Sequence, residues 1–261
     1  MHVQVLAKTD QEMRLVVDGL NPQIANSLRQ IMMSRLPTLA IETVDFSKND
    51  GVLYDEMLAH RLGLLALKFD TKAFVAKDDC DCEGKGCSGC ELVFVLDKQG
   101  PGMVYAKDLK SADKELASVV HPDTPLVELR AGQDLKLQAT ATIGLGTGHA
   151  RHQAAHAFYR LYPGVKVSGN ISNVDDVISS CSKKALNLTG KPSVTIDCDM
   201  CGECVEIAKP AGSLKIEGNT SKFVFIIESI SGLTAEQIFL QSLDILKKEA
   251  KDFGKQVGKL K

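Results

Sequence analysis

Alternating and helical hydrophobic patterns divide the chain into predicted strands and helices. Two short apolar runs separated by the polar residues 8–11 predict a β-hairpin at the N-terminus. Asn21 suits the capping position of a helix and Pro22 its first turn, and Pro37 ends the apolar stripe that follows. The same two patterns predict strands at 3–7, 13–17, 39–46, 64–69, 91–97, 126–143, 165–169 and 223–230, and further helices at 55–65 and 174–184.

The last predicted helix is the longest element. Thr234 and Gln237 form a capping box at its start. Behind them, apolar residues recur in steps of four, three, four, three and four, which is a heptad seam. One small sheet cannot cover so long a seam, so we expect a partner helix; the alternative is a core helix of this chain. The seam residues are Phe239, Leu243, Leu246, Ala250, Phe253 and Val257.

Composition and charge are those of an ordinary globular protein. The 261 residues contain 31 Lys and Arg against 33 Asp and Glu, no Trp and four Tyr. Near-neutral charge and few aromatic residues argue against a chain-wide nucleic-acid surface. No apolar run reaches the ~18–20 residues of a membrane span, and the N-terminus lacks the pattern of a signal peptide. We therefore expect a cytoplasmic protein.

Eight cysteines add the first chemical signal. In a reducing compartment, clustered thiolates indicate metal ligands rather than disulfides. Four of them lie in the glycine-rich segment 80–90, and this set satisfies a tetrahedral four-sulfur site, for which we predict zinc. An EF-hand is excluded because a cysteine stands where its last carboxylate belongs; the other alternative is a flexible loop with free thiols. The predicted zinc ligands are Cys80, Cys82, Cys87 and Cys90.

The second cysteine group indicates an iron–sulfur cluster. Cys198, Cys201 and Cys204 follow the spacing of the bacterial ferredoxin motif, but Ala208 occupies its fourth position. Cys181 is the remaining cysteine and supplies a remote fourth ligand. The prediction is one cluster of the 4Fe-4S or 3Fe-4S type. The alternatives are zinc at the same residues, no metal, or a buried free thiol at Cys181.

The remaining motifs in the sequence do not indicate a catalytic or cofactor-binding site. The glycines at 144, 146 and 148 do not form a dinucleotide fingerprint, because His149 breaks the pattern. His149, His152 and His156 share a face if the segment is helical, and we interpret them as surface or core histidines. No phosphate-binding loop, nucleophile elbow or aspartate triplet is present in the sequence. We expect no catalytic residues.

The order of these parts resembles a known family. Residues 21–37, 39–44 and 55–67 are similar to the first helix, the next strand and the adjoining motif of the α-like subunits of cellular RNA polymerases. The 80–90 loop is similar to the zinc loop of the third-largest subunit of eukaryotic RNA polymerase II, and residues 144–152 to its glycine-rich segment, with His152 where tryptophan is usual. The ferredoxin-like segment points to the archaeal members of the family.

The resemblance implies an α+β fold with three parts. In the family, a dimerisation domain of a sheet and long packing helices is interrupted by two inserts. One insert is a β-rich domain with the zinc loop, and the other is a ferredoxin-like iron–sulfur domain. The expected boundaries are 1–40, 155–169 and 213–261 for the dimerisation domain, 41–154 for the zinc-loop insert and 170–212 for the iron–sulfur insert.

It also implies a non-catalytic assembly subunit of DNA-directed RNA polymerase, a nucleotidyltransferase complex. Such subunits form a heterodimer with a smaller α-like subunit, called L in archaea. The heterodimer is the platform for the second-largest subunit, and small subunits N and P attach to it; DNA is reached only through the complex. The first helix's stripe is expected to pack at the same interface as the heptad seam. Its residues are Ile24, Leu28, Ile31 and Met32.

Two alternative functions remain at the level of sequence. The ferredoxin-like spacing also fits an electron carrier or redox protein, although no second cluster motif or flavin site accompanies it. The four-cysteine loop also fits a zinc-dependent nucleic-acid-binding protein, against which charge and aromatic content argue.

Overall fold

The chain divides into two compact units, and each unit contains long β-strands. The computed structural model describes residues 1–71, 73–111 and 117–260. Strands and helices occur in both units, which confirms the predicted α+β class. One unit comprises Met1–Ala7, Arg14–Asn26 and Phe158–Ile226, and the other comprises Lys8–Met13, Ser27–Ala157 and Ile227–Lys261.

Most of a four-stranded sheet with the order β1-β2-β14-β11 lies in the first unit. The predicted N-terminal hairpin is confirmed as β1 (His2–Lys8) and β2 (Glu12–Asp18). β11 (Ala155–Val167) and β14 (Leu214–Ser229) are much longer than predicted. The additional length comes from tertiary packing, because aromatic rings hold the two strands together on one face. The ring of Tyr159 lies 5.5 Å from Phe223 and 5.6 Å from Phe225.

Between β11 and β14 the chain forms a small substructure with few regular elements. Val177, Leu186 and Leu214 are buried in its core together with Cys204. The helix predicted at 174–184 is wrong in length, since it ends at Ser179 and the chain turns there toward the cysteines. The elements are α3 (Val174–Ser179), β12 (Leu186–Asn187), β13 (Ser193–Val194) and α4 (Glu203–Ile207).

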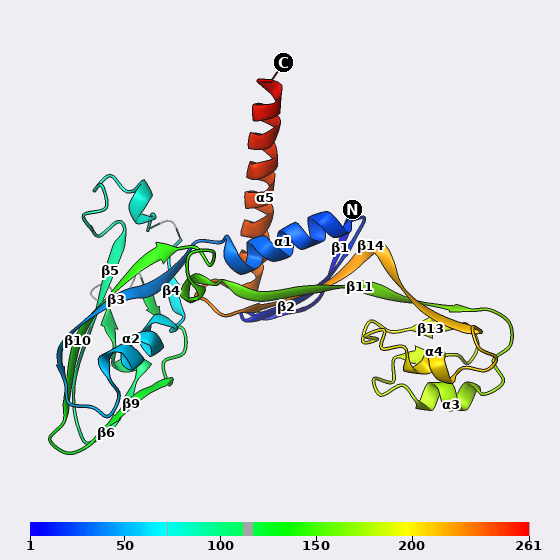
Figure 1. Cartoon of the computed structure of the whole chain (residues 1–261), viewed down its shortest axis with the longest axis horizontal. Coiled ribbons are helices and arrows are strands. Elements are labelled where there is room, and N and C mark those ends of the chain that lie inside the picture. Colours follow the sequence, from blue (N-terminus) through cyan, green and yellow to red (C-terminus); the bar gives the residue numbers. More distant parts are fainter. Residues whose placement is uncertain (72, 112–116, 261) are drawn as a thin grey trace. The chain divides into compact units, whose positions relative to one another are not determined.

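The second unit contains the sheet β3-β10-β5-β7, which is visible beside α2 in Figure 1. β10 pairs antiparallel with β3 and with β5, so that Ala139 lies opposite Val44 on one side and Phe94 on the other. Leu58 and Leu62 of α2 are fully buried in the core of this unit. The predicted strands 39–46 and 91–97 and the helix 55–65 are confirmed within a few residues. Their bounds are β3 (Thr38–Asn49), α2 (Asp55–Gly63), β5 (Glu91–Gln99), β7 (Lys110–Ser111) and β10 (Asp134–Gly144).

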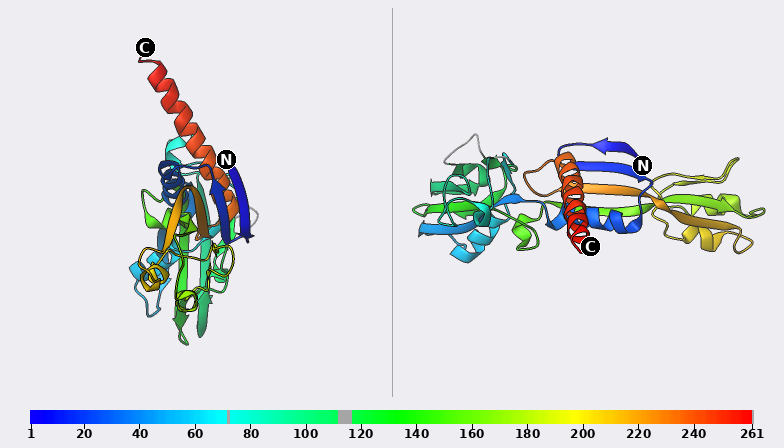
Figure 2. Two further views of the ribbon diagram at one scale, coloured as in Figure 1. Left: turned by 90° about the vertical axis from the view of Figure 1, so that its right-hand side faces the viewer. Right: turned by 90° about the horizontal axis from the view of Figure 1, so that it is seen from above.

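The two longest helices begin at the predicted caps. The side-chain oxygen of Asn21 accepts a hydrogen bond of 2.8 Å from the backbone of Ile24, at the start of α1 (Pro22–Ser34). Thr234 and Gln237 form the predicted capping box of α5 (Ala235–Gly258). Figure 2 shows the C-terminal turns of α5 extending past the other elements of their unit.

Shorter elements complete the second unit. It has two further pairs of strands, β4 with β8 and β6 with β9. β4 lies within the predicted strand 64–69 and β9 overlaps the predicted strand 126–143, whereas β6 and β8 are too short for a hydrophobic pattern to predict them. None of the described helices is both long and apolar enough to span a bilayer. The strands are β4 (Leu67–Phe69), β6 (Gly102–Tyr105), β8 (Ala117–Val119) and β9 (Pro125–Leu129), and single 3-10 turns lie at Lys77–Asp79, Ala106–Asp108 and Ala150–His152.

Candidate metal centres

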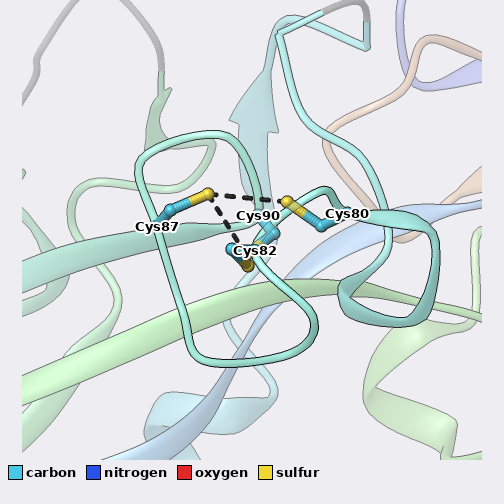
Figure 3. A group of neighbouring side chains, drawn as sticks. All are labelled: Cys80, Cys82, Cys87 and Cys90. Carbon is cyan, nitrogen blue, oxygen red and sulfur yellow. Dashed lines mark hydrogen bonds between the residues drawn. The ribbon is translucent and has the colours of Figure 1, made fainter.

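The first cysteine group lies on the loop that leads into β5. Its last member, Cys90, comes directly before the first residue of the strand. Figure 3 shows the four side chains pointing toward one another. The Sγ atoms are 3.5 Å apart for Cys80 and Cys87, 3.5 Å for Cys82 and Cys90, and 3.8 Å for Cys87 and Cys90. All four sulfur atoms lie within 4.8 Å of one another.

These distances suit a single tetrahedral ion. Four thiolates at a Zn–S distance of about 2.3 Å lie about 3.8 Å apart at tetrahedral angles. The loop bends sharply between the second and third cysteines, where Glu83, Gly84 and Gly86 have φ values of 55°, 78° and 88°. Glycine adopts this left-handed backbone without strain. The predicted four-sulfur site is therefore brought together, and its donor set suits zinc and other thiophilic metals.

The thiols of this loop differ in acidity. The hydrogen bond with Cys80 lowers the pKa of Cys82 to about 7, whereas burial raises the pKa of Cys90 to about 12. A coordinated metal ion displaces such protons, because it deprotonates the thiol that binds it. Metal binding at the loop therefore releases protons and weakens as the pH falls.

The second cysteine group lines one pocket of the first unit. Cys181 follows α3, Cys198 and Cys201 lie on the loop before α4, and Cys204 is on α4 itself. All four border the pocket, whose apolar wall includes Leu186, Val194 and Ile216. The pocket holds about 400 Å³ of empty space, part of it open to solvent.

Backbone N–H groups point toward two of the cysteine sulfurs in this group. The amide of Met200 donates a hydrogen bond of 3.4 Å to the Sγ of Cys198, and the amide of Ala185 donates one of 3.4 Å to the Sγ of Cys181. Met200 and Gly202 both have left-handed backbone, with φ values of 59° and 89°. N–H groups directed at sulfur stabilise a thiolate, because they donate to its negative charge.

The second group differs from the first in its arrangement. Within the described ranges, the 80–90 loop holds the one group of three or more Cys, His, Asp or Glu side chains that are arranged to bind a single metal ion. Burial raises the pKa of Cys204, and the negative charges of Cys198, Cys181 and Cys201 raise it further. The four predicted residues thus share one pocket and influence one another, but they do not form a single-ion tetrahedron.

The predicted interface residues divide between the core and the surface. In α1, Leu28, Ile31 and Met32 are buried, and only Ile24 is exposed. In α5, Phe239 is buried with the first turns, so this part of the predicted seam lies in the chain's own core. The rest of the seam is open: Leu243, Ala250, Phe253 and Val257 are exposed, and Leu246 is half-buried.

The three histidines do not share a face. His149 precedes a 3-10 turn and its Nδ1 accepts a hydrogen bond from the Arg151 backbone at 3.1 Å. His152 is buried, and His156 is exposed on β11. The interpretation as surface or core histidines is confirmed, while their placement on one helical face is wrong because the chain enters a strand at residue 155.

Comparisons with known proteins agree with the fold. Residues 41–160 match the family model of the RNA polymerase Rpb3/RpoA insert domain. The chain is 32% identical to the DNA-directed RNA polymerase subunit Rpo3 of Methanosphaera stadtmanae, with 96% of each chain covered. It is 36% identical to the same subunit of Methanothermobacter thermautotrophicus, again with 96% of each chain covered. It is 35% identical to that of Pyrobaculum calidifontis, covering 96% of this chain and 94% of the relative.

These similarities extend over nearly the whole chain and include both cysteine segments. The insert-domain match covers β3 to β10 and the four-cysteine loop, and so confirms the predicted relation to the third-largest polymerase subunit. The chain belongs to the family of archaeal RNA polymerase subunit Rpo3 and is a component of DNA-directed RNA polymerase.

Proposed function

We propose that this chain is a non-catalytic assembly subunit of the polymerase. It pairs with the smaller α-like subunit L, and the heterodimer forms the platform for the second-largest subunit and for the small subunits N and P. The observation that carries the proposal is the open apolar face of α5. Phe253 and Val257 are 68% and 43% exposed, although they continue the seam that begins in the core at Phe239.

An exposed row of this kind indicates a missing partner. Large apolar side chains aligned at heptad spacing are normally covered, because their exposure to water is unfavourable. Leu243 belongs to the same row and is 38% exposed. Permanent subunit interfaces are core-like and commonly bury about 2,000 Å² or more, which a helix of this length supplies together with its neighbours. A second apolar helix from subunit L is the occupant that matches the spacing.

We further propose the three-part division of the chain. Segments 1–40, 155–169 and 213–261 form the dimerisation domain, 41–154 the zinc-loop insert and 170–212 the iron–sulfur insert. The insert-domain match at 41–160 supports the middle boundary. The separate small core around Val177 and Leu214 supports the assignment of 170–212 as an insert of its own.

For the two cysteine groups we propose different metals. The 3.5–3.8 Å sulfur spacing at residues 80–90 supports a single zinc ion. At Cys181, Cys198, Cys201 and Cys204, the shared pocket, the ferredoxin-like sequence and the backbone N–H groups directed at sulfur support an iron–sulfur cluster. Both metals act structurally, since each binds elements that have few apolar contacts of their own.

Substitution on the exposed face of α5 tests the assembly role. We expect Phe253→Glu to weaken the complex with subunit L roughly thirtyfold, about 2 kcal/mol, because a carboxylate replaces a central apolar contact. Affinity is measured by titrating anaerobically purified chain with L. Lys251→Gln changes the net charge equally on the opposite face of the helix and serves as the control. Equal affinity of Phe253→Glu and the natural chain would contradict the proposed interface.

A further inference from the structure

Arg160 connects the sheet of the first unit to the loop that carries the second cysteine group. It lies on β11, and its guanidinium donates two hydrogen bonds to backbone carbonyls of that loop. Nη2 donates to Ile196 at 2.5 Å, and Nη1 donates to Cys198 at 2.8 Å. The first cysteine of the triplet is therefore fixed in position by a residue far away in the sequence.

The charge of Arg160 has no carboxylate partner within the described residues. The two acceptors are neutral carbonyl oxygens, and the Nε atom is buried without any hydrogen-bond partner. A guanidinium remains protonated at all ordinary pH values. Partial burial of such a charge is unfavourable unless a negative group lies nearby. The loop that Arg160 binds carries Cys198, one of the four cysteines that border the pocket.

We propose that Arg160 is the positioning and charge-compensating residue of the cluster site formed by Cys181, Cys198, Cys201 and Cys204. The inference rests on the cluster assignment proposed above. Four thiolates around an iron–sulfur core make a net anion, and a cation behind the loop offsets part of its charge. The two carbonyl bonds also hold the Cys198 backbone while the cysteine sulfur faces the pocket.

Two measurable consequences follow from this arrangement. The net charge around a cluster helps to set its reduction potential, and adding an electron is easier when a cation is near. Removal of the guanidinium should therefore shift the potential to more negative values. Loss of the two carbonyl bonds should free the Cys198 backbone, so that iron leaves the site faster when a chelator is present.

The experiment uses the anaerobically purified complex with subunit L. Arg160→Gln is expected to lower the reduction potential in a redox titration followed by electron paramagnetic resonance, and to release iron to a ferrous chelator at least tenfold faster. Lys166→Gln is the matched control, because Lys166 lies on the same strand, carries the same charge and is 71% exposed in its pair with Glu217. The control is expected to leave both values unchanged.

Arg160→Lys separates charge from geometry and covers the case in which the glutamine variant does not fold. An ammonium group keeps the charge but cannot hold two carbonyls in a planar fork. We expect a potential close to that of the natural chain together with faster iron release. Unchanged iron release in both the lysine variant and any folded glutamine variant would overturn the inference. Absence of iron from the natural complex would instead overturn the cluster assignment, which distinguishes the two failures.

Discussion

His152 lies buried next to the start of β3, where its Nδ1–H donates a hydrogen bond of 3.0 Å to the carbonyl oxygen of Thr38. The hydroxyl of Thr38 in turn donates to the carbonyl of His152 at 2.8 Å. A Cβ atom at Gly144 would come within 2.6 Å of the imidazole ring, so glycine provides the space for it. The histidine therefore joins the segment before β11 to the start of β3, and its neutral form fits this site.

This site predicts a pH dependence. Burial lowers the pKa of His152, and the charge of Arg151 and the neighbouring His149 lower it further, although Thr38 and Glu42 act in the opposite direction. The unfolded chain, with a histidine pKa of about 6.5, then binds more protons than the folded chain at mildly acidic pH. The contribution to stability is complete above that value and is lost as the pH falls below it.

We therefore expect amide protection at the β3–β10 junction to fall between pH 7.5 and pH 5.5. Hydrogen exchange of peptides that cover residues 38–44 and 140–152, corrected for intrinsic exchange, measures it. His152→Gln should remove most of this pH dependence. His156→Gln, which removes an exposed histidine from β11, should retain it. The same pH response in both variants would assign the effect to another group.

Residue spacing predicted the four-cysteine group at 80–90 and the triplet at 198–204, whereas Cys181 was added as the remaining cysteine. Short loops with fixed spacing bring neighbouring thiols together, so Cys80 to Cys90 could be assigned before any fold was known. Arg160 was missed, because 38 residues separate it from Cys198 and no local pattern marks the contact. Nothing in the sequence distinguishes it from Lys166, the other charged side chain of the same strand, which is exposed.

At the scale of elements, the four-cysteine loop fixes the entry to β5. The amide of Val75 donates to the carbonyl of Gly89 at 3.0 Å, and the ion pair between Lys77 and Glu91 measures 2.7 Å. Few apolar side chains lie in the loop, so a metal ion bound by its four cysteines would supply most of the energy that orders it. Loss of one ligand should therefore loosen the whole loop.

Cys87→Ser tests this expectation. Its sulfur is exposed, so the substitution disturbs little packing, but only three thiolates remain to bind the metal. We expect the zinc content to fall well below one ion per chain and trypsin to cleave faster at the exposed Lys85. Elemental analysis and mass spectrometry of the fragments measure both. Cys181→Ser should leave zinc content and this cleavage unchanged, and a normal zinc content in Cys87→Ser would contradict the four-ligand site.

The lengths of some elements could not be predicted from the local sequence pattern. β11 continues through Pro163 and Gly164, which by themselves indicate a break. The side chain of Leu161 occupies the space that a Cβ at Gly218 would need, so close approach of β11 and β14 overrides the local signal. In α5, by contrast, the capping box and the apolar repeat correctly predicted both the start and the type of the element.

At the scale of the whole molecule, the second cysteine group connects segments that have a small core. Cys181 and the triplet come from different elements, and a shared cluster would bind them to each other and, through Arg160, to β11. The stability of residues 170–212 and the ability to assemble should therefore depend on the cluster.

Cys201→Ser is expected to lose the cluster, to become sensitive to proteolysis within 170–212 and to lower the yield of the complex with L severalfold. The sulfur of Cys201 is exposed, so the expected effect comes from the lost ligand rather than from lost packing. Anaerobic co-purification, iron analysis and limited proteolysis measure these changes. Cys87→Ser provides the comparison, since it should spare residues 170–212. Normal affinity and proteolytic resistance of Cys201→Ser would refute the structural role.

The sequence by itself determined the helix caps, most of the regular elements, the two groups of four cysteines and the family. These features depend on residues close together in the chain, where spacing alone controls geometry. Only the tertiary structure decided that Phe239 lies in the core while Phe253 is open, that His152 is buried, and that Arg160 binds the carbonyl of Cys198. Burial and long-range hydrogen bonds depend on which strands become neighbours, and that choice is made by packing across the fold.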